Sequence, residues 1–259
     1  MLKGLAAGLL VVSGLAAGAS AQHWGPLHGL VASTSSVMHT SLAELAQAAG
    51  LLGVPFPPLG GSSGGTTLGG VTVYEWDSTE IPDADDWDGY ATFELNGDVF
   101  SAGIAFDVSV FEEFGIVEPF DASLFVHLIG LCWHELGHIT YGASMAAWCV
   151  SNPATCAAYA DCIAGLEDGE GNSLGYGADN DPCSESFAHD LTLAMLCQGK
   201  LVICTSGNPQ AAVLLEELDL QIELVRAECE ATASACSQCP GPPMPPSYTN
   251  CSPPTCNCA

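Results

Sequence analysis

The pentapeptide His134-Glu135-Leu136-Gly137-His138 combines residue types and a spacing that indicate a defined chemistry. On an α-helix, residues four positions apart share one face, so both imidazoles can bind one metal ion about 2 Å from each ring nitrogen. Glu135 lies beside the first histidine, where its carboxylate can contact a water molecule on that ion. Zinc lowers the pKa of such a water toward about 7, and a carboxylate can accept its proton as the water attacks a carbonyl carbon. The motif therefore predicts a zinc site with His134 and His138 as ligands and Glu135 as general base.

A helix that presents this motif is predicted from Asp121 to about Tyr141. Asp121 is a suitable N-cap, and Gly142 stands just beyond the expected end. Apolar residues recur at helical spacing between them, at positions 125, 128, 129, 132 and 136. Further helical patterns cover residues 143–165, 184–198 and 209–236.

The strand signals come earlier in the chain. Apolar and β-branched residues favour strands at Val71–Tyr74, Tyr90–Leu95 and Val99–Val110, with a hairpin turn at Asn96–Asp98. Strands followed by helices predict an α+β fold, in which a small N-terminal sheet precedes the motif helix and further helices.

The motif, on a helix that follows predicted strands, resembles that of the zincin metallopeptidases. The resemblance covers about residues 70–200, and it implies a zincin-like fold and zinc-dependent hydrolysis of peptide bonds. In the metzincin class the motif continues as HExxHxxGxxH. This chain has Tyr141 in place of the glycine and Ser144 in place of the third histidine, so the metzincin class is excluded.

In gluzincins the third ligand is a glutamate on a later helix, and Glu185 is the best match, 47 residues after His138. Gluzincins commonly carry an aspartate one turn further on, which orients a ligand histidine. Here that position is His189, and the acid, Asp190, comes one residue later. His189 or Asp190 therefore remains an alternative third ligand, and His189 could instead donate to the developing oxyanion.

Other polar residues are weaker candidates for a role in the metal site. His127 precedes His134 by seven residues and shares its helical face, where a packed or supporting role is expected. Tyr141, Tyr159 and Tyr176 are conceivable hydrogen-bond donors to a transition state.

Two acidic clusters, at residues 77–88 and 167–181, have the oxygen donors that calcium prefers, although the EF-hand spacing fails. Calcium binding and solvated acidic turns both remain open for them.

The composition excludes some partners. The chain has 30 Asp and Glu residues against 3 Lys and Arg residues, a formal net charge of −27. Phosphate backbones and anionic lipid repel such a chain, so nucleic-acid binding is not expected. We expect protein or peptide substrates and no membrane association of the mature chain. The oligomeric state and the cleavage specificity stay open.

Residues 1–21 have the features of an export signal: Lys3, an apolar run at Leu5–Val12, and the small residues Ala19 and Ala21 before the expected cleavage. Residues 22–65 are expected to be an arm, a linker or a removable pro-segment. Within them, Ser41 and Glu44 suggest a capping box for a short helix through Ala49, and Gly60–Gly65 has linker composition.

All 13 cysteines lie at or after Cys132, which agrees with an oxidising, extracellular compartment. Cys132 lies in an apolar helical run and is expected to be a buried free thiol. Cys236 and Cys239 form a CxxC without a matching second pair, so we predict disulfides there rather than a zinc ribbon.

Together these features predict a zincin-like catalytic domain at residues 66–236 and a Pro/Cys-rich tail at 237–259, with disulfides stapling the C-terminal part. The predicted protein is a secreted zinc metallopeptidase whose metal ligands are His134, His138 and Glu185. The alternative is a non-catalytic, disulfide-rich extracellular module that binds zinc or calcium.

Overall fold

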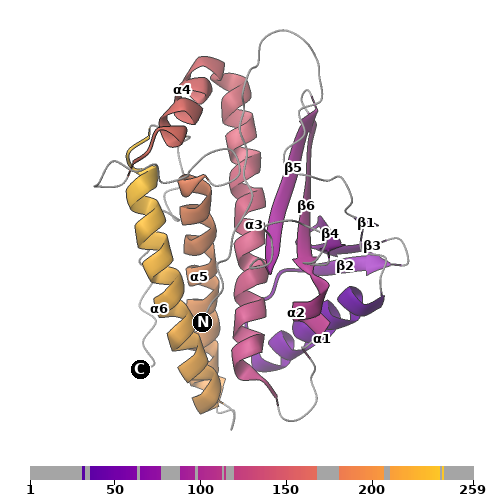
Figure 1. The fold of residues 1–259 in the computed structure, drawn as a ribbon. Coiled ribbons are helices and arrows are strands. Elements are labelled where there is room, and N and C mark those ends of the chain that lie inside the picture. Colours follow the sequence, from indigo (N-terminus) through magenta and orange to yellow (C-terminus); the bar gives the residue numbers. More distant parts are fainter. Residues whose placement is uncertain are drawn as a thin grey trace.

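The computed structural model describes residues 31–32, 36–62, 65–76, 88–96, 99–112, 114, 120–167, 181–206, 211–239 and 241. These residues form a mixed α+β fold (Figure 1). The elements are β1 (Val31–Ala32), α1 (Ser36–Leu52), β2 (Leu59–Ser62), β3 (Gly65–Leu68), β4 (Val71–Trp76), β5 (Gly89–Asn96), β6 (Val99–Asp107), α2 (Val108–Glu112), α3 (Ala122–Ser151), α4 (Pro153–Ala164), α5 (Pro182–Ser206) and α6 (Ala211–Cys236). The α+β prediction, with strands ahead of the long helices, is confirmed.

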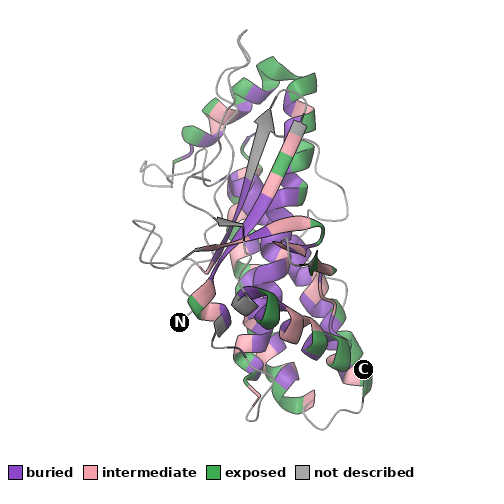
Figure 2. Ribbon diagram, turned by 90° about the vertical axis from the view of Figure 1, so that its right-hand side faces the viewer, coloured by how far each residue is buried: buried purple, intermediate pink, exposed green. Residues whose placement is uncertain are grey.

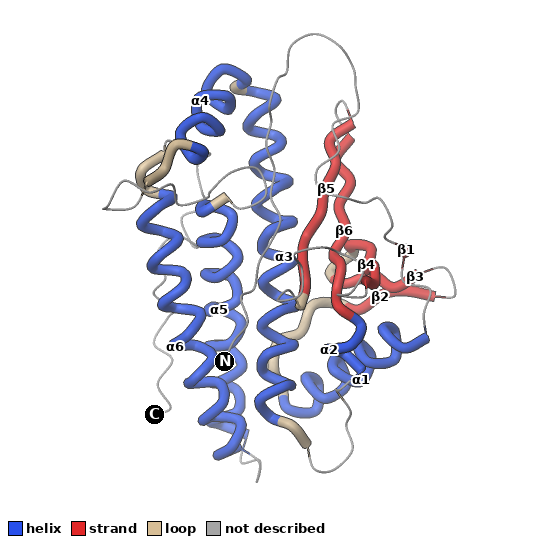
Figure 3. The backbone as a smooth tube through the Cα atoms, in the orientation of Figure 1, coloured by secondary structure: helices blue, strands red, loops and turns tan. Residues whose placement is uncertain are grey.

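The sheet has the strand order β2-β3-β4-β6-β5, and β1 pairs with β4 outside this path (Figure 3). The pairing of β4 with β6 is parallel, and the other pairings are antiparallel. Asn96 pairs with Val99, as the predicted hairpin requires, and β5 is left as an edge strand.

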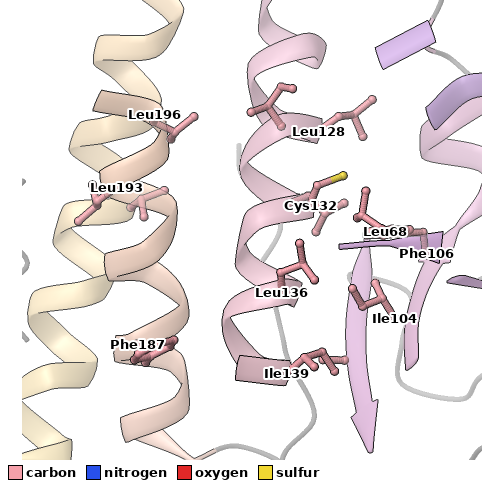
Figure 4. Packing of buried hydrophobic residues seen from close by; sticks show 14 of the residues in the cluster. Leu68, Ile104, Phe106, Leu128, Cys132, Leu136, Ile139, Phe187, Leu193 and Leu196 are labelled. Carbon is pink, nitrogen blue, oxygen red and sulfur yellow. The ribbon is translucent and has the colours of Figure 1, made fainter. Parts of the chain in front are cut away.

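Helix α3 lies between the sheet and the helix pair α5 and α6 (Figure 1). Its side chains Leu128, Cys132 and Leu136 lie near Leu68 and Ile104 of the sheet (Figure 4). Buried residues run through the middle of the molecule, and the exposed ones lie on the outer faces of the helices (Figure 2). Helix α3 therefore has little contact with water along most of its length, and the motif that it carries is buried.

Helix α3 is longer than predicted. Its start is as expected, because the Asp121 carboxylate accepts a hydrogen bond from the Leu124 backbone N–H at 3.0 Å. The predicted end at Gly142 is wrong, since the helix runs on to Ser151. Residues beyond the glycine, including Met145 and Cys149, are buried, and this packing outweighs the weak helix propensity of one glycine.

The glycine-rich stretch predicted to be a linker forms the hairpin of β2 and β3 instead. Gly61 and Gly65 both have φ of 137°, a backbone conformation that side-chain-bearing residues rarely adopt. The linker prediction was wrong for these residues because the same glycines that suggest flexibility also allow this hairpin.

Helix α1 belongs to the core, although it lies in the segment expected to be an arm. It begins at Ser36, so the predicted capping box at Ser41 is wrong, and Ser41 is buried inside the helix. Met38, Leu42 and Leu45 are fully buried. Removal of residues 22–65 as a pro-segment stays a prediction.

Three disulfides hold the C-terminal part together: Cys149–Cys156, Cys162–Cys239 and Cys183–Cys236. Cys236 and Cys239 thus bond to different partners, which confirms the preference for disulfides over a zinc ribbon. Cys197, Cys204 and Cys229 are also disulfide-bonded. Cys132 is a buried free thiol, as predicted. Such bonding is compatible with an extracellular protein.

Within the described residues, α5 is the helix that is long and apolar enough to span a membrane, with 67% of its apolar window buried inside the protein. Core helices pass the same test, and α5 carries Glu185, His189 and Asp190. The predicted signal at 1–21, most of both acidic clusters and most of the Pro/Cys tail lie outside the described residues.

Candidate metal centre

The two motif histidines converge on one point, as their spacing predicts. The Nε2 atoms of His134 and His138 lie 2.9 Å apart on one face of α3. His134, Glu135 and His138 are all fully buried. Two buried imidazole nitrogens at this separation can form part of a metal-binding set.

Helix α5 brings Glu185 to the same point. Glu185 Oε2 lies 3.5 Å from His134 Nε2 and 3.8 Å from His138 Nε2. Gly137, between the histidines, allows this approach, because a Cβ there would stand 2.6 Å from Ala188 Cα of α5. The third ligand expected from the spacing therefore lies with the two histidines.

These three atoms have separations suited to one small metal ion. A point equidistant from atoms that are 2.9, 3.5 and 3.8 Å apart lies about 2.0 Å from each, and zinc binds nitrogen and carboxylate oxygen at about 2.0–2.2 Å. The donor set of two imidazoles and one carboxylate also occurs in catalytic zinc sites, which keep a fourth position for water or substrate.

The histidines are in the protonation state that a metal requires. Burial lowers the pKa of His134 to about 4, although the charge of Glu228 opposes the shift. Burial also lowers the pKa of His138 well below its usual value, and the charges of His134 and His189 lower it further. Both rings are therefore neutral at neutral pH and have lone pairs available for a metal.

A serine orients the second histidine. His138 Nδ1 and Ser184 Oγ are hydrogen-bonded at 2.7 Å, and both groups are fully buried. With Nε2 turned toward a metal, Nδ1–H donates to the serine, which fixes the tautomer and the ring plane. Ser184 could not be predicted from the sequence, because its role depends on how α5 docks against α3.

Glu135 lies beside this set, and neither of its carboxylate oxygens has a hydrogen-bond partner. Burial and the charge of Glu185 raise the pKa of Glu135 well above its ordinary value. The backbone N–H of Ala91 in β5 lowers the pKa of Glu135 and so opposes this shift, although it makes no hydrogen bond to the carboxylate. A buried carboxylate without a protein partner can accept a proton or contact a bound water.

His189 belongs to a second set of potential ligands that overlaps the first. One ligand atom from each of His134, Glu185 and His189 lies within 4.8 Å of the others, so this buried group could hold a metal ion. The rings of His134 and His189 are 4.7 Å apart between centroids. The shorter separations of the set with His138 favour that set as the ligands of the first ion. Asp190 is buried on α5 and is not part of the second set.

Helix α6 contributes an acid that the sequence analysis did not single out. Glu228 Oε2 lies 3.3 Å from His189 Nε2. The geometry of this contact is too poor for a hydrogen bond, and His189 Nδ1 has no hydrogen-bond partner either. Burial lowers the pKa of His189, and His189 in turn lowers the pKa of Glu228. The sequence offered no signal for Glu228, one of several glutamates on an amphipathic helix.

Tyr141 and Tyr159, considered above as transition-state donors, instead contact Asp181. Tyr159 Oη donates to Asp181 Oδ1 at 2.6 Å, and Tyr141 Oη donates to Oδ2 at 3.3 Å. Asp181 also accepts from the Cys183 backbone N–H at 2.7 Å, at the start of α5. Burial raises the pKa of Asp181 to about 6, and these donors oppose the shift. This network joins α3 and α4 to the end of α5 that carries Glu185.

His127 lies apart from this centre. Its Nε2 is 2.9 Å from Asp88 Oδ2, next to β5, so its side-chain hydrogen bond is to this acid and not to a candidate metal ligand. Tyr176, the third tyrosine considered as a donor, and most of the candidate calcium ligands lie outside the described residues.

Comparisons of the chain with protein-family models, curated proteins and solved structures give no match. A functional proposal for this chain therefore stands on the sequence motif and on the geometry of the buried site.

Proposed function

We propose that the protein is a secreted, gluzincin-like zinc metallopeptidase in which His134, His138 and Glu185 hold the metal and Glu135 is the general base. The observation that carries this proposal is the buried, unpartnered carboxylate of Glu135 beside three converging ligand atoms. A purely structural packing of α3 and α5 has no use for a buried acid without a hydrogen bond, because such a group costs stability.

Each of these residues has its own role in the proposed reaction. A zinc ion in this site would supply a Lewis acid for the peptide carbonyl and would lower the pKa of water. Glu135 accepts the proton of the attacking water at a carboxylate oxygen and delivers it to the departing peptide nitrogen. The raised pKa of Glu135 suits this task, because a stronger base holds the proton until the leaving group needs it. Ser184 keeps His138 in the tautomer that leaves Nε2 free.

The test compares the full-length protein with its Glu135→Gln variant, using cleavage of casein and of fluorogenic peptides beside zinc content. We expect cleavage by the parent protein and at least a hundredfold loss in the variant, which should retain zinc. Glu217→Gln is a matched control, because it makes the same change on α6. Retention of the rate in Glu135→Gln would refute the mechanism.

Burial of the site supports a second candidate, a non-catalytic extracellular module that binds metal for structure. His134 and His138 are fully buried and Glu185 is only 5% exposed, and His189 could complete a set of four protein ligands. Structural zinc sites fill all four positions with protein atoms. On this reading the parent protein holds one zinc ion and cleaves nothing, and His189→Ala loses both metal affinity and thermal stability.

A further inference from the structure

His189 is a buried histidine whose nitrogens lack ordinary partners. His189 is only 4% exposed, and neither its Nδ1 nor its Nε2 atom makes a hydrogen bond. Buried side-chain nitrogens normally have at least one partner. The ring lies beside His134, on the α5 helix that also supplies Glu185. The imidazole of His189 thus lies next to the first metal position without a hydrogen-bond partner.

The separation between His189 and Glu228 resembles that of two ligands on one ion more than that of a hydrogen bond. Charge-assisted N–H···O bonds are about 2.7–2.9 Å long. The His189 Nε2 and Glu228 Oε2 atoms are 3.3 Å apart and poorly aligned. Two donors that each lie about 2.0–2.1 Å from a tetrahedral ion are about 3.3–3.4 Å apart.

Glu185 can serve both positions. Its Oε2 lies 3.5 and 3.8 Å from the two motif histidines, and one of its oxygens is within 4.8 Å of a nitrogen of His189. A carboxylate has two oxygens, and carboxylates hold both ions of the two-metal centres found in helical bundles.

The charge around the site also favours a second cation. Glu135, Glu185 and Glu228 bring three carboxyl groups to one cluster of imidazoles in a largely buried site, where charged groups need a partner. The chain has only 3 Lys and Arg residues, and Lys200 pairs with Asp219. A divalent cation beside Glu228 would bring positive charge to these carboxyl groups.

We propose that His189, Glu228 and Glu185 form a second divalent-metal position beside the site of His134, His138 and Glu185. The imidazole and carboxylate donors suit zinc, cobalt or manganese. The inference rests on the metal-binding half of the proposed function and is independent of peptidase activity. Two ions that share Glu185 would place two Lewis acids beside Glu135.

The first test is metal stoichiometry in the full-length, disulfide-bonded protein. The protein is loaded with zinc, equilibrated in a zinc buffer that strips weak sites from the acidic surface, and analysed by mass spectrometry of the metal. We expect two zinc ions in the parent protein and one in Glu228→Gln and in His189→Gln. Glu230→Gln, an exposed acid two residues along α6, is the matched control and should keep two.

Glu228→Gln is the decisive variant, because its side chain is 40% exposed and the change preserves shape. One zinc ion in the parent protein, or two in Glu228→Gln, would overturn the second position. A single zinc ion in the parent protein is still compatible with the proposed peptidase. A parent protein that binds no zinc contradicts both the peptidase and the second metal position.

Cobalt substitution tests whether the two ions are neighbours. Two cobalt ions bridged by one carboxylate couple magnetically, so the paramagnetic resonance signal per cobalt should be weaker in the parent protein than in Glu228→Gln. Equal signals per cobalt would show two separated ions and would overturn the sharing of Glu185.

Discussion

The hydrogen bond from Tyr159 to Asp181 should be worth more than any other contact at the start of α5. At 2.6 Å it is short, and its acceptor is a fully buried carboxylate. Hydrogen bonds to charged groups contribute about 1.5–3 kcal/mol. Tyr159→Phe keeps the ring and removes only the donor, so we expect a loss of about 2 kcal/mol in the free energy of unfolding.

Tyr141→Phe is the matched comparison, because it removes the longer donor, at 3.3 Å, from the same carboxylate. We expect a loss of about 1 kcal/mol or less for it. In a chain of this size 1 kcal/mol corresponds to about 2–4 °C in Tm, so the two variants should differ measurably.

The pH dependence follows from the pKa of Asp181. Burial raises that pKa to about 6 in the folded protein, so the folded state holds the proton more tightly than the unfolded state does. The contribution of Asp181 to stability therefore falls as the pH rises through about 6. Tyr159 favours the ionised form, so its removal raises the pKa further. The cost of Tyr159→Phe should consequently be largest above pH 6 and should shrink below it.

Urea unfolding of the metal-free, disulfide-bonded protein above and below pH 6 measures both effects. Equal losses for the two variants, or a loss from Tyr159→Phe that does not change with pH, would refute this account of the network.

Three further outcomes are expected. Leu45→Ala, in the buried face of α1, should cost about 3 kcal/mol in urea unfolding, because it opens a cavity in the hydrophobic core. Ser184→Ala should weaken zinc binding at least tenfold in competition with a chelator, because His138 loses the partner of Nδ1. Zinc should stay bound well below the ordinary histidine pKa of about 6.5, because burial lowers the pKa of His134 to about 4 and protons then compete poorly. Metal content after dialysis across that pH range checks the last outcome.

The parts of the site that follow from local geometry could be predicted from the sequence. His134 and His138 face one point because a helix has 3.6 residues per turn, whatever surrounds it. Glu185 was predicted as the third ligand from its spacing and from the family resemblance, and the structure places it within 4 Å of both histidines.

The parts that depend on docking between helices could not be predicted. Ser184 reaches His138 only because α5 begins at Pro182 and packs closely against Gly137. Glu228 was one acid among many on α6. In the fold, the end of α3 and the β2–β3 hairpin were missed for a related reason: burial and strand pairing overrode what glycine indicates locally.

The place of α3 between the sheet and the helix pair accounts for the chemistry of the site. The sheet packs against one side of the helix, where Glu135 is fully buried, while α5 and α6 bring Glu185, His189 and Glu228 to the other. Burial alone would favour neutral side chains and would leave their nitrogens and oxygens without partners at a cost in stability. A metal ion would bind one nitrogen of each histidine and would compensate the charge of the carboxylates. The unpartnered carboxylate of Glu135 and the unpartnered nitrogens of His189 lie beside this candidate site, as the proposal of a bound metal ion and water would require.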